Sequence, residues 1–82
     1  MVAKECLIDT FDKIKAFNEA ALSVVGKITV RQDDYVVDGR SMMGLFSLDL
    51  SRTIIVDLES EEEADAFQKA LLSIYTDKYK KL

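Results

Sequence analysis

Asp38-Gly39-Arg40-Ser41-Met42-Met43-Gly44-Leu45-Phe46-Ser47-Leu48 is the stretch of the sequence that decides the fold. Gly39 is suited to end the strand before it, and Ser41 is placed to cap a helical segment over residues 42–48. That segment is too short and too rich in glycine to form a free-standing helix, because helix nucleation is costly. We therefore expect one or two helical turns that lie on a sheet, with Ser41 at their start.

On the N-terminal side, the sequence predicts a strand and then an amphipathic helix. Residues 2–8 alternate with the period of two that is typical of a half-buried strand. Asp9 or Thr10 is suited to cap the helix, and Gly26 to end it. The apolar stripe of this helix repeats at spacings of three and four, at Phe11, Ile14, Phe17, Ala21 and Val24 or Val25.

Between that helix and the opening stretch, two short runs rich in β-branched residues predict a hairpin. Residues 27–31 and 35–37 are the two runs, and residues 32–34, Gln-Asp-Asp, are the connection. After the opening stretch, residues 52–58 contain three consecutive β-branched residues and predict a central strand that is buried on at least one face.

The last predicted element is a helix with a clear start. Ser60 and Glu63 form a capping box, and the helix is expected to end near Asp77. Its buried face consists of Ala64, Phe67, Leu71 and Ile74. The order strand, helix, strand, strand, short helix, strand, helix is that of a two-layer α+β fold, and by itself it permits several such folds, including ferredoxin-like ones.

Composition limits the class of protein. The 82 residues, 49% of them hydrophobic, predict a single domain over residues 1–82. The net charge of −4 argues against nucleic-acid binding. Cys6 has no second cysteine or histidine with which to form a disulfide or a metal site, so we interpret it as a packing residue of a cytoplasmic protein. Nothing predicts a membrane span, a cofactor or a metal, and the basic Lys78-Tyr79-Lys80-Lys81 end is explained by the helix dipole.

The opening stretch resembles the regulatory-serine segment of HPr, the small phosphocarrier of the bacterial sugar phosphotransferase system, whose usual form is Lys/Arg-Ser-Ile-Met-Gly-Leu/Val-Met-Ser-Leu. The resemblance is strong over residues 35–50 and consistent in length and element order elsewhere. It implies an HPr-like open-faced sandwich, in which three helices cover one face of a four-stranded antiparallel sheet in the order β-α-β-β-α-β-α.

The resemblance fails where the family has its carrier site, Gly-Ile/Leu-His-Ala-Arg-Pro-Ala. The family's spacing places the histidine at Thr10, the arginine at Asp12 and the proline at Lys13, and the sequence contains no histidine. Phosphohistidine chemistry needs a ring nitrogen, while threonine forms only a stable ester and the aspartate repels a dianion. We expect a divergent member of the family that is not an enzyme and cannot carry out histidine phosphoryl transfer.

The serine site, in contrast, keeps its surroundings. A family paralogue that acts in carbon catabolite repression lacks the histidine, keeps the serine and, once phosphorylated, serves as corepressor for a transcription factor. The resemblance therefore implies phosphorylation at Ser41 by a serine kinase, and docking of partner proteins by Arg40, Met42, Met43 and Phe46. Asp49 departs from the small uncharged residue usual in the family, and its charge is expected to weaken docking.

Two interpretations of function remain open. One is a regulatory protein-interaction module that is switched at Ser41. The other is a phosphorylation-independent interaction or structural protein with an HPr fold, in which Ser41 is only a helix cap. An enzyme or a small-molecule binder is disfavoured, because the sequence shows neither a glycine-rich phosphate loop nor a cluster of metal ligands.

Overall fold

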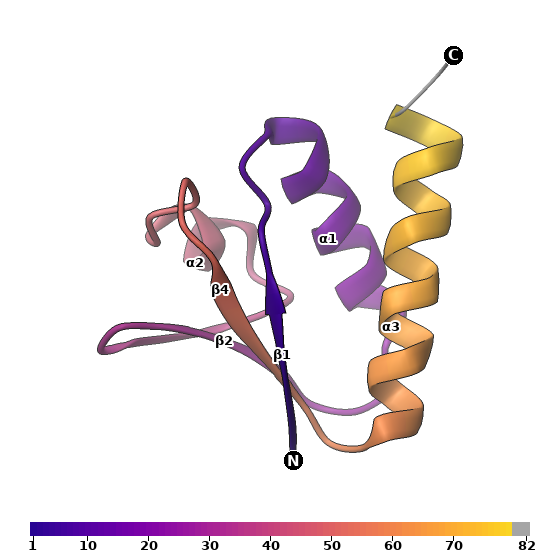
Figure 1. The fold of residues 1–82 in the computed structure, drawn as a ribbon, viewed down its shortest axis with the longest axis horizontal. Coiled ribbons are helices and arrows are strands. Elements are labelled where there is room, and N and C mark those ends of the chain that lie inside the picture. Colours follow the sequence, from indigo (N-terminus) through magenta and orange to yellow (C-terminus); the bar gives the residue numbers. More distant parts are fainter. Residues whose placement is uncertain (80–82) are drawn as a thin grey trace.

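The computed structural model describes residues 1–79 and contains one four-stranded sheet and three α-helices (Figure 1). A π-helical turn, η1 (Tyr75–Tyr79), continues the last helix. The elements follow in the order β1 (Val2–Cys6), α1 (Phe11–Ser23), β2 (Ile28–Gln32), β3 (Tyr35–Asp38), α2 (Met42–Phe46), β4 (Ile54–Leu58) and α3 (Glu61–Ile74).

The sheet has the strand order β1-β4-β2-β3, and every neighbouring pair is antiparallel. Val30 of β2 lies opposite Val56 of β4 on one side and Val37 of β3 on the other. Alternate residues of β2 and β4 point toward the helices and are buried: Ile28, Val30, Ile54, Val56 and Leu58. All three helices add side chains to this one core, which confirms the predicted α+β fold with helices on a single face of the sheet.

Helix α1 begins at the predicted cap, because Thr10 Oγ1 accepts a hydrogen bond from the backbone N–H of Lys13 at 3.2 Å. Phe11 of the predicted stripe lies outside the core, since it is 59% exposed, and of the alternatives Val24 and Val25 it is Val24 that is buried. Helical side chains lean toward the N-terminus, so the first residue of α1 reaches past the helix rather than over the sheet. Val25 lies beyond the helix, which ends at Ser23.

The connection from α1 to β2 passes Gly26, the predicted helix stop. Its φ is negative, so a left-handed conformation is not why the chain has glycine here. A Cβ at this position would collide with the carboxylate oxygens of Glu63 and Glu59, and Glu59 Oε1 accepts a hydrogen bond from Lys27 N at 2.5 Å. In this conformation the space beside residue 26 is taken by two glutamate side chains, and a larger residue would displace their carboxylates.

Helix α3 is capped by Ser60, whose Oγ accepts a hydrogen bond from the backbone N–H of Glu63 at 3.2 Å. The Glu63 carboxylate, predicted to reach back to the helix start, lies against Gly26 instead. Phe67 packs edge-on against Phe17 of α1, with ring centroids 5.0 Å apart.

The predicted end of this helix near Asp77 falls within η1. There Lys78 Nζ and Tyr79 Oη both donate hydrogen bonds to the Glu19 carboxylate of α1. The last two lysines of the predicted basic end lie outside the described residues.

The end of β1 and the turn between β2 and β3 differ slightly from their predicted positions. Strand β1 ends at Cys6 rather than at residue 8, and the β2–β3 turn contains only Asp33 and Asp34, because Gln32 pairs with Tyr35 as part of the sheet. Asp33 adopts a φ of 53°, which is a conformation that aspartate tolerates in tight turns.

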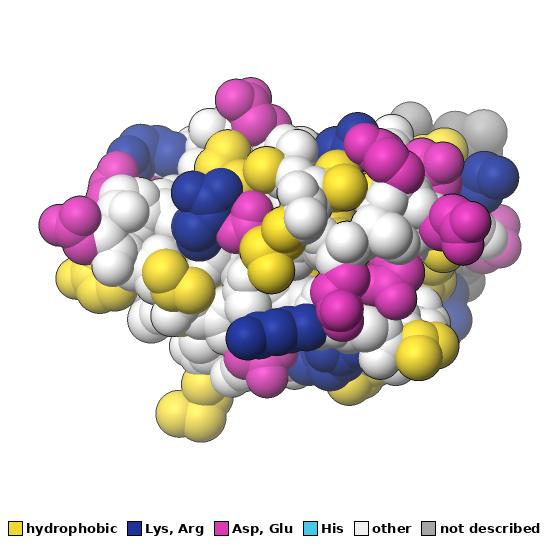
Figure 2. Space-filling view, turned by 90° about the horizontal axis from the view of Figure 1, so that it is seen from below, with side chains coloured by type: hydrophobic (Ala, Val, Ile, Leu, Met, Phe, Trp, Pro, Cys, Tyr) yellow, Lys and Arg dark blue, Asp and Glu magenta, His cyan; other side chains and the backbone are white. Residues whose placement is uncertain are grey.

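Charged side chains of both signs are interspersed on the face that Figure 2 shows, with hydrophobic side chains scattered between them and no broad basic area. Among residues 1–79, no helix has the length and apolar character needed to cross a membrane. The same residues contain no group of three or more histidine, cysteine, aspartate or glutamate side chains that could hold a metal ion.

Candidate regulatory and docking site

Ser41 is the N-cap of α2. Its Oγ accepts a hydrogen bond from the backbone N–H of Gly44 at 3.0 Å, and its carbonyl accepts one from Leu45 N at 3.0 Å. Leu45 is fully buried and anchors the short helix on the core. This anchor, rather than helix propensity, explains how five residues hold a helical conformation. Ser41 itself is partly exposed at the start of the helix.

Arg40 joins the site to the far end of α1. Its guanidinium Nη2 donates hydrogen bonds to the carbonyls of Val24 and Gly26 at 2.5 Å each. Its own carbonyl accepts a hydrogen bond from Asn18 Nδ2 at 3.0 Å. Cations are favourable at the C-terminal end of a helix, where carbonyls lack partners within the helix. The side chain of Arg40 is thus engaged with α1 rather than with Ser41.

Three exposed apolar side chains, Phe11, Met43 and Phe46, form what we call the aromatic surface. The rings of Phe11 and Phe46 stack with centroids 6.3 Å apart and an interplanar angle of 26°. Met43 is 85% exposed and lies one helical turn from Phe46. Met42, also predicted to dock partners, is half-buried and packs against the core. The start of α1 and the helix after Ser41 therefore share one apolar surface.

The residues at the counterpart of the carrier site make only local contacts. Thr10 caps α1, and Asp12 lies 3.8 Å from Lys15 Nζ. Lys13 Nζ donates a hydrogen bond to Asp9 Oδ1 at 3.0 Å, and this bond raises the pKa of Lys13 and lowers the pKa of Asp9. These side chains place a hydroxyl and two ion pairs, but no ring nitrogen, at the helix start.

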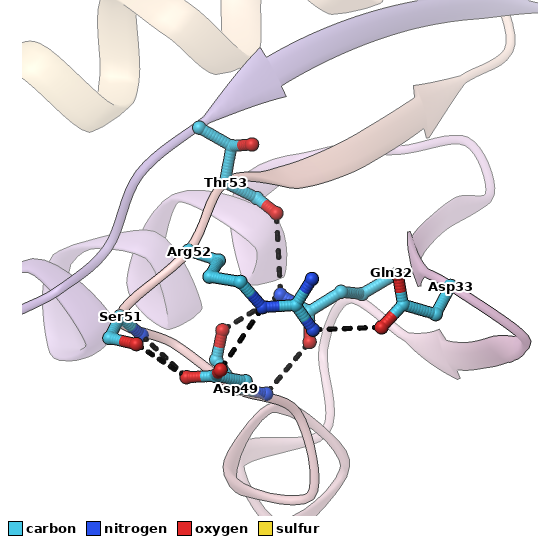
Figure 3. Close-up of polar contacts among 6 residues, drawn as sticks. All are labelled: Gln32, Asp33, Asp49, Ser51, Arg52 and Thr53. Carbon is cyan, nitrogen blue, oxygen red and sulfur yellow. Dashed lines mark hydrogen bonds and ion pairs between the residues drawn. The ribbon is translucent and has the colours of Figure 1, made fainter.

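Asp49, whose charge was expected to disturb docking, is held in a polar network with the β2–β3 turn (Figure 3). Its Oδ1 accepts hydrogen bonds from the backbone N–H and the hydroxyl of Ser51, and its Oδ2 accepts one from Arg52 Nε. The hydrogen bond from the Ser51 hydroxyl, followed by that from Arg52, lowers the pKa of Asp49. Arg52 also donates to Asp33 Oδ2 at 2.8 Å. The carboxylate is thus tied to its own loop.

Gln32, the last residue of β2, binds the same loop through its side chain. The side chain is 6% exposed, and its Nε2 donates to the carbonyls of Asp49 at 2.7 Å and Thr53 at 3.3 Å. Its Oε1 accepts a hydrogen bond from Asp49 N at 2.7 Å (Figure 3). Both N–H donors and the carbonyl oxygen of this buried amide are directed at residues 49 and 53, so Gln32 holds the loop between α2 and β4 against β2.

Sequence reasoning missed two residues of this site, Phe11 and Asn18. Phe11 fits the apolar repeat of α1 and was assigned to the core, although its position directly after the cap was a signal that its side chain points away from the sheet. Asn18 lies on a helix, where asparagine has low propensity, and this was the available signal that it has a hydrogen-bonding role.

Comparisons with known proteins address the fold. No protein-family model matches the sequence, and no curated protein matches it either. Among solved structures, HPr-C-His from Thermoanaerobacter tengcongensis is similar with a TM-score of 0.72 and 24% identity, over 100% of this chain and 99% of that one. The phosphocarrier protein HPr from Bacillus anthracis str. Ames is similar with a TM-score of 0.65 and 20% identity, over 89% of this chain and 94% of that one. The chain therefore has the fold of the HPr phosphocarrier proteins.

Proposed function

We propose that this chain is an HPr-like regulatory and protein-interaction module of the phosphotransferase-system type, and that it is not a histidine phosphocarrier. The observation that carries the proposal is the aromatic surface beside Ser41, because stacked phenylalanine rings and an exposed methionine next to a helix cap make no contribution to the core. Exposed Met and Phe side chains are typical of surfaces that bind other proteins.

The absence of carrier chemistry follows from the residues at the start of α1. The sequence has no histidine, so no imidazole can form the labile phosphoramidate. A phosphate on Thr10 would be a stable ester, and the nearby Asp12 carboxylate would oppose a dianion by Coulomb repulsion. Transfer onward to a sugar transporter is therefore not part of the proposal.

Phosphorylation at Ser41 supports the regulatory half of the proposal on physical grounds. A phosphoryl group would add a charge of about −1.5 to −2 beside the aromatic surface and would keep oxygen acceptors at the first turn of α2. Because the Arg40 guanidinium is bound to the carbonyls of Val24 and Gly26, the added charge would be left for a partner's cations to bind. On the basis of the resemblance to HPr, we propose a serine kinase and a transcription regulator as the partners.

A second function, phosphorylation-independent interaction, is favoured by a different observation. Ser41 already accepts a hydrogen bond from Gly44 N, and this capping role by itself accounts for a serine at that position. In this alternative, partners bind the aromatic surface directly and Ser41 stays unmodified.

The experiment that separates the two functions is incubation with an HPr serine kinase and ATP, followed by intact-mass measurement and peptide mapping. We expect one phosphate on Ser41, no phosphate in Ser41→Ala, and an unchanged yield in Ser47→Ala, since Ser47 lies at the other end of α2. No incorporation, with an active kinase on an HPr substrate, leaves the phosphorylation-independent function. An acid-labile phosphate after incubation with the general phosphotransferase enzyme would contradict the proposal itself.

A further inference from the structure

The outer edge of β1 offers a second surface, whose chemistry differs from that of the aromatic surface. β1 lies at the end of the sheet and, among residues 1–79, pairs with β4 alone. One row of its backbone N–H and C=O groups therefore faces away from the sheet without a strand partner. In Figure 1, β1 stands in front of β4 and β2, with α3 to its right.

Two adjoining hollows open between β1 and α3, and together we call them the β1–α3 trench. The first, of about 260 Å³, is bordered by Leu7 and Leu72, which are 42% and 67% exposed. The second, of about 270 Å³, reaches down to Phe67 in the core. Both are lined by Cys6, Gln68 and Leu71, so they lie side by side. The trench is thus a largely apolar depression that runs beside an unpaired strand edge.

A lysine stands in the middle of the strand that borders the trench. Val2, Lys4 and Cys6 lie on the helix-facing side of β1, and Val2 and Cys6 pack against the core. Lys4 Nζ lies 3.7 Å from Glu61 Oε2 at the start of α3, in a pair whose side chains are 47% and 70% exposed. An exposed pair of this kind contributes little, so Lys4 is available to another carboxylate. A charged residue on the helix-facing side of an edge strand also opposes pairing with a purely apolar strand.

We propose that the β1–α3 trench binds an extended segment of a partner protein, which adds to β1 as a fifth, antiparallel strand. The segment carries an acidic residue opposite Lys4 and apolar residues two positions to either side. Residues that lie directly opposite in a sheet share a face, so the acid meets the ammonium and the apolar residue opposite Cys6 enters the trench. The apolar residue opposite Val2 packs beside that core-facing side chain. Backbone hydrogen bonds along the free edge supply the rest of the binding energy.

A second copy of this chain fits the same edge poorly. Antiparallel pairing of two β1 strands across a two-fold axis keeps the helix-facing residues opposite one another. The register that pairs all of Val2–Cys6 sets Lys4 against Lys4, and a register centred one residue later sets Glu5 against Glu5. Like charges directly opposite one another destabilise a strand pair. In these two registers charge therefore disfavours self-association, whereas an acidic residue opposite Lys4 is favoured.

The test uses two blocked peptides, Thr-Val-Thr-Glu-Thr-Val-Thr and the same peptide with lysine in place of glutamate, titrated into the ¹⁵N-labelled full chain. We expect the glutamate peptide to bind more tightly by about five- to tenfold, with amide shifts confined to β1 and the α3 residues of the trench. In Lys4→Glu the preference reverses. The matched control Lys27→Glu makes the same charge change away from the trench and keeps the original preference.

Three results would overturn the proposal: no shifts in β1 at millimolar glutamate peptide, equal binding of the two peptides, or shifts centred elsewhere in the molecule. Sedimentation of the protein alone tests whether a second copy of the chain occupies the edge instead. A dimer whose formation perturbs the same β1 amides would assign the edge to that second copy. Circular dichroism of Lys4→Glu confirms that the variant is folded, since the exposed Lys4 side chain makes no core contact.

Discussion

Replacement of Gln32 by leucine should destabilise the protein more than its small change in volume suggests. The substitution removes three hydrogen bonds and leaves the backbone N–H and C=O of Asp49 and the carbonyl of Thr53 without their side-chain partner. At roughly 1 kcal/mol per bond lost, and more for any group that stays dry, the free energy of unfolding falls by about 2 to 4 kcal/mol. For a domain of this size, each kcal/mol corresponds to about 4 to 8 °C in Tm.

Urea unfolding followed by far-UV circular dichroism suits this measurement, because the protein has no tryptophan. Gln68→Leu is the matched control, since Gln68 is the same residue type on the exposed side of α3, and its effect should stay within about 0.5 kcal/mol. Equal stability of the two variants would refute the role assigned to Gln32.

A glutamate at residue 32 provides an internal check. It keeps the acceptor for Asp49 N but replaces the amide donor with a carboxylate oxygen that faces two carbonyls. Its pKa in the folded state should rise, because burial and the facing carbonyls disfavour the charge. The deficit of Gln32→Glu relative to the natural protein should then shrink as the pH falls below neutral, while the deficit of Gln32→Leu should not depend on pH.

Two other predictions concern side chains near the candidate site. Arg40→Ala should lower the free energy of unfolding by about 1 to 3 kcal/mol, because the carbonyls of Val24 and Gly26 lose a charged donor; unchanged urea stability would show that Arg40 acts only at a docking surface. The hydrogen bonds from Ser51 and Arg52 lower the pKa of Asp49 in the folded state. Their contribution to stability is therefore complete above the usual aspartate pKa of about 4, and it is lost as the pH falls through the lower pKa of the folded state. Asp49→Asn should therefore lose less stability than the natural protein between pH 7 and pH 3 at constant salt; parallel curves would contradict this.

The elements could be predicted from the sequence because local signals agreed with one another, whereas the choice of fold among those that the element order permits came from the resemblance of residues 35–50 to HPr. Thr10, Ser41 and Ser60 each occupy the cap position that their side chains predict, and each accepts the expected hydrogen bond three residues on. The run of three β-branched residues in the predicted strand 52–58 also leads to a buried strand, which begins two residues later, at Ile54–Leu58. These features depend on neighbours within one element, which is why residue order is enough to find them.

The details that were missed depend on contacts between distant elements. The clamp from Arg40 to the end of α1 and the position of Glu63 against Gly26 join residues that no periodic pattern connects. The exposure of Phe11 follows from where α1 begins relative to the sheet, and its stacking on Phe46 follows from where α2 lies. Pairing across elements is decided by packing, so a pattern within one element cannot specify it.

The strand order also has a consequence for how the molecule folds. Only β2 and β3 are joined by a tight turn, whereas β1 pairs with β4 and brings Val2 opposite Leu58. Closing a long loop costs entropy before any contact repays it, so the hairpin is expected to form early and β1 to be added late. The same strand is then expected to open first in the native state, so we expect the fastest-exchanging backbone amides of the sheet along β1.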